Sequence, residues 1–281
     1  MIKKVVRLFL SLLLVMLCTT SHVRAQDRTL VFGVHPYLGA EEIIKRFAPL
    51  IQFLEHGLGM SIVLKVGSDY QEHINEIGND KLDIALLGPA SYVEMAKIFG
   101  EKPFLAKIEK NGSSMIYGQI IVSNTSSIRS IRELEGKSFA FGDPHSTLSS
   151  LVPRALLKQN GISLEKLAFS KHFDGHINVA YAVLSGEMDA GAVKDSIFEK
   201  FKQKGLRSIA QTPKFSEHPF VTRSDLEPEL IHKLRLLMQN LHNSTECRAI
   251  LHAINPGITA LVDVQDSDYD SLRQVLFASD K

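Results

Sequence analysis

Cysteine is almost missing from this chain, which has 281 residues and only two cysteines, Cys18 and Cys247. Cys18 falls in an N-terminal segment that we expect to be cleaved, so one thiol would remain and no internal disulfide could form. Heptads, low-complexity tracts and solenoid periods are also missing. Stability must therefore come from a hydrophobic core, and hydrophobic residues make up 44% of the sequence.

A strong charge of either sign is absent as well. The 32 basic and 31 acidic residues give a formal net charge of +1. Cleavage after residue 25 would remove four basic residues and no acidic one, leaving 28 basic against 31 acidic residues, a net charge of −3. This balance gives no reason to expect nucleic acid as a partner.

The N-terminus has the pattern of a secretory signal peptide. Three basic residues precede an apolar run from Leu8 to Leu17, and a small residue, Ala25, marks the expected cleavage site. The apolar run is too short to span a bilayer as a helix. A lipid anchor on Cys18 is not expected, because the residue before it is bulky. Residues 1–25 are therefore predicted to be removed, and the mature protein to be periplasmic.

Strand-like and helix-like patterns alternate along the rest of the chain. Expected strands are 29–34, 62–66, 83–87, 119–122, 137–141, 167–170 and 188–193, and expected helices are 41–58, 70–78, 90–99, 148–160, 177–185, 227–241 and 267–277. Such alternation predicts an α/β fold in which helices cover parallel sheets.

Two polar or short segments are interpreted as crossings between two lobes. Residues 123–127 would lead into a second lobe and residues 220–223 would lead back. The predicted lobe 1 is 26–123 plus 222–281, and lobe 2 is 124–221. Open α/β sheets bind ligands beyond the carboxyl ends of their strands, so an interlobe cleft would collect these loops.

The segment FGDPHSTLSS, Phe141 to Ser150, is the most informative part of the sequence. A strand runs into the breakers Gly142 and Pro144, and Ser146 and Thr147 can then cap a helix. Free N–H groups, two hydroxyls and the positive end of the helix would face one point, which favours an oxyanion. A capping role without any ligand is the commoner explanation of such a pattern.

A series of short elements resembles one known family over nearly the whole mature chain. These elements are Phe32-Gly33-Val34, Asp83-Ile84-Ala85, Gly142-Asp143-Pro144 followed by Ser146-Thr147, Leu151-Val152-Pro153, Gly175-His176 and Asp189-Ala190-Gly191-Ala192. The chain is similar to the phosphonate-, phosphite- and phosphate-binding proteins of ABC importers. The resemblance implies a two-lobe α/β periplasmic binding protein with two crossover segments, which closes over a small oxyanion and performs no catalysis.

The resemblance also implies a binding site. In that family a Ser/Thr run at a helix start holds phosphonyl oxygens, but here Leu148 and Ser149 replace a further Ser and a Gly. A His opening a helix and two Tyr also contact the ligand, and His218 here stands before Pro219 where an Asp is common. The implied ligand-binding residues are Ser146, Thr147, His176, Tyr70, Tyr117 and His218.

His218 has consequences for ligand choice. A carboxylate would select a protonated oxyanion, whereas a protonated His would attract full negative charge. We expect His176 and His218 to enter the same cleft and to strengthen anion binding as the pH falls from 8 to 5. A position of His218 in an exposed loop remains an open alternative.

Other functions are compatible with some of the same residues. Ser146, His176 and Asp143 or Asp174 could be drawn as a hydrolase triad, although no G-x-S-x-G motif is present. His172, His176 and His218 could converge as metal ligands. Neither a cofactor nor a metal is predicted. The protein is expected to be a monomer. Its partner would be an ABC permease or, alternatively, the periplasmic domain of a sensor kinase.

Overall fold

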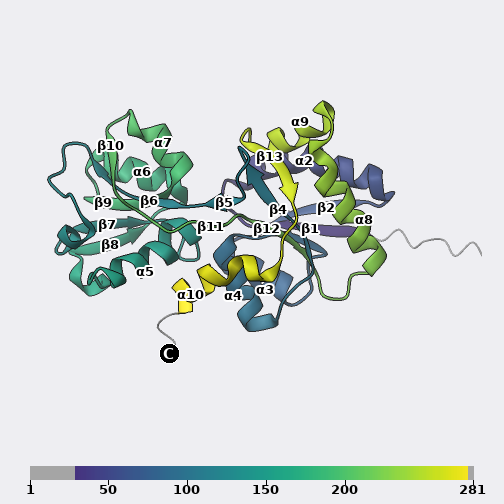
Figure 1. Cartoon of the computed structure of the whole chain (residues 1–281), viewed down its shortest axis with the longest axis horizontal. Helices are drawn as coiled ribbons and strands as arrows, with labels where there is room; N and C mark the ends of the chain where they lie inside the picture. The colour runs from purple at the N-terminus through teal and green to yellow at the C-terminus, as the bar shows by residue number, and fades with distance from the viewer. Residues whose placement is uncertain (1–28, 278–281) are drawn as a thin grey trace, which may run out of the picture.

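The computed structural model describes residues 29–277, so the predicted signal peptide lies outside the described residues. Figure 1 shows two α/β halves side by side, joined by extended segments. The predicted fold class, two α/β lobes with two crossover segments, is confirmed. Within the described range, no helix has the length and apolar character needed to cross a membrane.

The first half is built on a six-stranded sheet in the order β13-β4-β12-β3-β1-β2. Its strands are β1 (Leu30–Val34), β2 (Ile62–Val66), β3 (Ile84–Leu86), β4 (Phe104–Lys110), β12 (Pro219–Thr222) and β13 (Ile258–Val262). The helices that cover it are α2 (Ala40–Leu58), α3 (Tyr70–Gly78), α4 (Pro89–Phe99), α8 (Pro228–Gln239) and α9 (Thr245–Ile254).

The second half contains a five-stranded sheet in the order β10-β6-β9-β7-β8. Its strands are β6 (Gly118–Ser123), β7 (Ser138–Phe141), β8 (Phe169–His172), β9 (Ala190–Lys194) and β10 (Leu206–Gln211). Its helices are α5 (Val152–Gln159), α6 (Gly175–Ser185) and α7 (Asp195–Lys202), with a π-helical turn, η2 (Thr147–Leu151), just before α5.

The sheets are mixed, whereas the sequence pattern predicted parallel ones. β1 pairs with β2 and β3 in parallel, and β7 pairs with β8 and β9 in parallel. The strands next to the crossings, β4, β12, β6 and β10, pair antiparallel. An apolar run shows that a strand is buried, but it does not show the direction of its neighbour.

The predicted crossing points are wrong by one strand on each side. The predicted lobe 1 includes β6, but this strand pairs with β9 and β10 in the second half. The strand β12 lies between β3 and β4 in the first half rather than in the return crossing. The crossings are instead the antiparallel pair β5 (Met115–Ile116) and β11 (Phe215–Ser216). Backbone pairing decides sheet membership, and side-chain pattern does not reveal it.

The apolar face of α2 forms much of the first core. Its spacing buries Ile43, Phe47 and Leu50 completely against the sheet. The ring of Phe47 lies 6.2 Å from that of Phe32 in β1. Each such side chain contributes about 1.5–3 kcal/mol through burial. The helix ends at Leu58 and is capped by Gly59, whose φ of 70° is easily adopted only by glycine.

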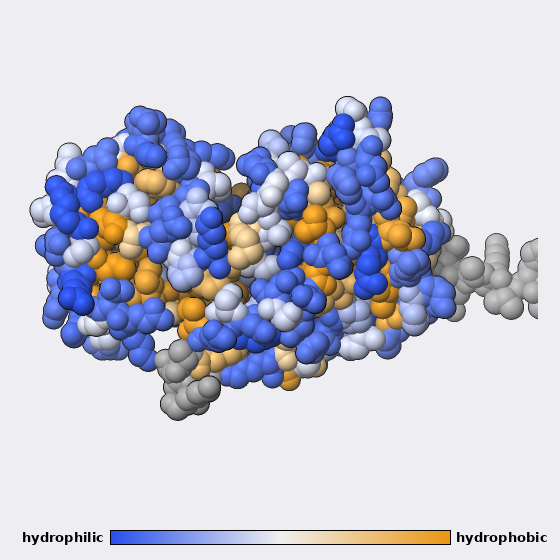
Figure 2. Space-filling view, viewed as in Figure 1, coloured by the Kyte–Doolittle hydropathy of each residue, from blue (hydrophilic) through white to orange (hydrophobic). Residues whose placement is uncertain are grey.

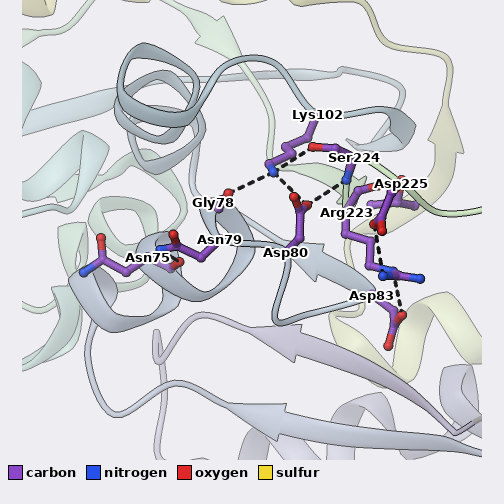
Figure 3. Close-up of polar contacts among 10 residues, drawn as sticks. Asn75, Gly78, Asn79, Asp80, Asp83, Lys102, Arg223, Ser224 and Asp225 are labelled. Atoms are coloured by element: carbon purple, nitrogen blue, oxygen red, sulfur yellow. Dashed lines mark hydrogen bonds and ion pairs between the residues drawn. The ribbon is translucent and has the colours of Figure 1, made fainter.

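A buried lysine fixes the first half where the chain returns from the second (Figure 3). Lys102 Nζ donates to Gly78 O at 2.9 Å, to Asp80 Oδ1 at 2.7 Å and to Ser224 Oγ at 2.9 Å. Ser224 N also donates to Asp80 Oδ1, at 2.7 Å. Burial alone would raise the pKa of Asp80, but these bonds lower it below its usual value. The segment after β12 is thereby held against the end of α3.

An apolar cluster also joins the halves on the side where α10 (Asp270–Phe277) lies (Figure 1). Leu148 and Val152, from the second half, pack in one cluster with Tyr92 of α4 and Leu272 of α10. α10 contacts both α4 and α5. The two halves are therefore held by more than their crossing strands, and the start of η2 lies at their contact.

Candidate functional site

A cavity of about 430 Å³ lies between the two halves, and all six residues predicted for the site line it. Figure 2 shows a notch in the surface between the halves. Tyr70 and His218 reach the cavity from the first half, and Ser146, Thr147 and His176 from the second. Tyr117, the sixth, follows β5 at the crossing. Residues distant in sequence are thus brought together around one space.

The helix start at Ser146 is not built as a simple cap. Ser146 precedes η2, but its side chain makes no capping hydrogen bond, so the explanation by capping alone is wrong. The helix begins with a π turn, a form that often occurs at functional sites. Ser149, at the place of a family glycine, is accommodated because Gly142 lacks a Cβ; an added Cβ would collide with the Ser149 hydroxyl.

Each of the two cavity hydroxyls accepts one hydrogen bond from the protein. Thr147 Oγ1 accepts from Ala90 N at 3.0 Å, across the contact between the halves. Ser146 Oγ accepts from the Ser149 hydroxyl at 2.7 Å. A hydroxyl that accepts in this way keeps its own proton for donation. The backbone N–H groups at the start of η2 have no intrahelical acceptors. This side of the cavity therefore presents donors.

His176 is fixed in one neutral tautomer. Its Nδ1 accepts from Lys194 N at 3.1 Å, so the neutral ring carries its proton on Nε2 and can donate there. Burial lowers the pKa of His176 well below its usual value, and the neighbouring Lys194 and His218 lower it further. The expectation that His176 adds positive charge at mildly acidic pH is therefore wrong. It is a neutral donor because the site is poorly solvated.

His218 lines the cavity and is not an exposed loop residue. Its Nδ1 donates to Glu217 Oε2 at 2.5 Å, and its ring stacks on that of His35 with centroids 5.4 Å apart. Burial lowers the pKa of His218, and the raising effect of Glu217 does not offset this. The expected protonation of His218 near neutral pH is thus not supported either.

Tyrosines form two other walls of the cavity. The ring of Tyr70 lies 5.1 Å from that of His35, and Tyr37 lies 5.2 Å from the same ring. Burial raises the pKa of Tyr70, so its hydroxyl remains a donor at neutral pH. A hydrogen bond to Asp195 raises the pKa of Tyr117. Both phenols are therefore neutral, polar groups.

Sequence reasoning missed several cavity residues: His35, Lys110, Lys194 and Glu217. His35 directly follows β1, and Lys194 is the last residue of β9. Their position at the carboxyl ends of strands is the signal that could have found them. Burial, followed by the charge of Lys110, lowers the pKa of Lys194 to about 8.

Glu217 is the buried acid of the cavity. Lys110 Nζ lies 2.7 Å from its Oε1, while His218 contacts its other carboxylate oxygen. Burial alone would raise the pKa of Glu217, but His218 and Lys110 lower it well below its usual range. Its carboxylate is therefore ionised, and both of its oxygens already have partners within the protein.

The two catalytic and metal alternatives do not fit this geometry. A hydrolase triad needs the His Nδ1–H to donate to an acid, whereas Nδ1 of His176 accepts a backbone N–H. His172 does not line the cavity; it contacts Arg154 at 2.7 Å and Gly142 O at 2.5 Å. Among residues 29–277, no group of three His, Cys, Asp or Glu side chains is arranged to hold a metal ion.

Two α/β lobes around a donor-lined cavity, joined by two strand crossings, define a substrate-binding protein of the periplasmic type. Residues 32–269 match a protein family described as "ABC transporter, phosphonate, periplasmic substrate-binding protein", and the chain belongs to this family. The predicted resemblance is confirmed. Membership implies a periplasmic location and a binding rather than an enzymatic family.

The individual relatives have low sequence identity to this chain. The chain is 27% identical over 272 residues to the "Phosphate-import protein PhnD" of Mycolicibacterium smegmatis, covering 88% of this chain and 84% of the relative. It is 25% identical over 249 residues to the "Phosphonates-binding periplasmic protein" of Escherichia coli, covering 85% and 73%.

Solved structures support the fold. A binding protein of an ABC phosphonate transporter from Pseudomonas aeruginosa gives a TM-score of 0.77 at 20% identity, covering 88% of this chain and 85% of that chain. PhnD1 of Prochlorococcus marinus, solved with methylphosphonate, gives 0.76 at 20% identity, covering 89% and 97%.

Proposed function

We propose that this protein captures a small phosphonate-, phosphite- or phosphate-like oxyanion in the cavity between its lobes and delivers it to an ABC importer. The observation that carries the proposal is the convergence of uncommitted donors: the Ser146 and Thr147 hydroxyls, the η2 backbone N–H groups and Nε2–H of His176. These donors match an anion that has acceptor oxygens on several sides.

The neutral state of the donors is suited to a partly protonated or fully ionised oxyanion. An imidazole that does not titrate near pH 7 donates equally well across the periplasmic pH range. Removal of water from the cavity strengthens such hydrogen bonds, because the local dielectric constant falls. We propose that the lobes close over the ligand for this reason.

The names of the relatives support the same ligand class. They are described as phosphate-importing, phosphonate-binding and phosphite-binding proteins. Delivery to an ABC permease follows from the family. The alternative partner, a sensor-kinase periplasmic domain, stays a prediction, as do the monomeric state and the absence of catalysis.

Titration calorimetry tests the proposal with methylphosphonate, phosphite, phosphate and, as a control anion, sulfate. We expect at least one of the three phosphorus oxyanions to bind more tightly than sulfate. Ser146→Ala should weaken that binding, while the matched Ser126→Ala, outside the cavity, should not. Failure of the folded protein to bind any of the three would refute the proposal.

A further inference from the structure

The cavity has room for more than one tetrahedral oxyanion. Its volume of about 430 Å³ corresponds to roughly 14 water molecules at ~30 Å³ each. A phosphonyl group displaces on the order of three water molecules. A ligand seated at η2 thus leaves space for a further chemical group, whose character is set by the other side chains that line the cavity.

The two cavity carboxylates, Glu217 and Asp195, already have hydrogen-bond partners within the protein. Glu217 is paired with Lys110 at 2.7 Å and with His218 at 2.5 Å. Asp195 accepts from Gln119 Nε2 at 2.8 Å and is hydrogen-bonded to Tyr117. A ligand ammonium would have to share these carboxylates with partners that already offset their charge. The cavity therefore offers little for a cationic tail.

Lys194, in contrast to these carboxylates, is a charged cavity residue without an ion-pair partner among the described residues. It ends β9 at the cavity, is partly buried, and has no carboxylate within ion-pair distance in the described part of the chain. The charged and titratable groups that act on it come from both halves: Lys110, Glu217, Lys200, Arg46, His35, His176 and His218. Of these groups, only Glu217 carries a negative charge, and the others are cationic or neutral. An unpaired ammonium at a cavity wall is a binding group for an anion.

We propose that the ligand carries a second anionic group, a carboxylate, next to its phosphonyl group, and that Lys194 binds this carboxylate. The inference rests on the proposed function, because the phosphonyl group is assigned to the Ser146–Thr147 helix start. The protein then prefers phosphonocarboxylates to phosphonates with neutral or cationic tails. The lowered pKa of Lys194 agrees with this, since burial disfavours an ammonium that has no carboxylate within ion-pair distance in the described part of the chain.

Three probes of nearly equal size isolate the charge of the tail: phosphonoacetate, propylphosphonate and 2-aminoethylphosphonate. We expect phosphonoacetate to bind about 10- to 100-fold more tightly than propylphosphonate, as for a hydrogen bond to a charged group. We expect 2-aminoethylphosphonate to bind more weakly than propylphosphonate. Equal affinities, or tightest binding of the aminoethyl compound, would overturn the inference.

Two variants assign the preference to Lys194. Lys194→Met should abolish the difference between phosphonoacetate and propylphosphonate. Lys200→Met removes the same charge from an exposed residue of α7 and should leave the difference intact. A preference that survives in Lys194→Met, or that both variants abolish, would refute the role of Lys194. Binding of methylphosphonate, phosphite or phosphate without a preference for phosphonoacetate among the three probes would refute only this inference. A folded protein that binds neither the probes nor any of those three oxyanions would refute the proposed function as well.

Discussion

Lys194 should destabilise the ligand-free protein, and its replacement by Met should therefore stabilise it. Burial lowers the pKa of Lys194 from 10.5 to about 8. This difference corresponds to about 3 kcal/mol of unfavourable free energy for the charged form in the folded state at pH 7. Because the side chain keeps some contact with solvent, we expect Lys194→Met to raise the free energy of unfolding by about 2–3 kcal/mol.

The pH dependence of this gain has a defined sign. Between pH 8 and 10.5 the folded protein has lost the Lys194 proton while the unfolded chain still holds it, so wild-type stability rises with pH. Below pH 8 both states are protonated and the full penalty remains. The advantage of Lys194→Met should thus shrink from about 2–3 kcal/mol at pH 7 to about 1 kcal/mol at pH 9.5.

Urea unfolding followed by far-ultraviolet circular dichroism measures this, because the chain has no tryptophan for fluorescence. Lys200→Met serves as the control for loss of a charge, with an expected change below about 0.5 kcal/mol. A Lys194→Met protein that is no more stable than wild type at pH 7, or whose gain does not diminish with pH, would refute the reasoning.

Three further outcomes are expected. Thr147→Val should weaken oxyanion binding by about 1–3 kcal/mol in calorimetry, because a charge-assisted bond is lost, while Thr125→Val should have no effect; equal affinities would remove Thr147 from the site. The ¹⁵N shifts of His176 should show a neutral Nε2–H ring from pH 8 down to 5.5, and titration near pH 6.5 would contradict its burial. Lys102→Met should cost about 1–3 kcal/mol in urea unfolding, since Asp80 would lose its cation, and a neutral effect would show that this ion pair contributes nothing.

Part of the order of helices and strands was accessible from local pattern, but helix α7 was not predicted. The predicted α3 matches its observed bounds, Tyr70–Gly78, and β2 matches Ile62–Val66. The strands β4, β10 and β13 were not predicted. β10 is only partly buried, with little apolar signal. The crossings at β5 and β11 are two residues each, and only backbone pairing across the chain defines strands so short.

The residues that line the cavity were predictable where they belong to a local motif. Ser146, Thr147 and His176 each stand at a helix start with recognisable turn chemistry. Lys194 and His35 belong to no such motif, and only their position at the carboxyl end of a buried strand points to a ligand site. Their place at the cavity follows from the packing of two sheets, which sequence periodicity does not encode.

The role of His218 shows most clearly what a linear pattern cannot give. The resemblance placed an acid at this position, and its replacement by His suggested a gain of positive charge. In the structure the acid is present one residue earlier, as Glu217, and the His218 ring donates to it at 2.5 Å. Lys110 balances the same carboxylate at 2.7 Å. The cavity thus keeps its acid but no longer offers it to a ligand, because both oxygens are bonded within the protein. The hydrogen-bond partners of Glu217, rather than the identity of the residue before Pro219, therefore decide which charge faces the ligand.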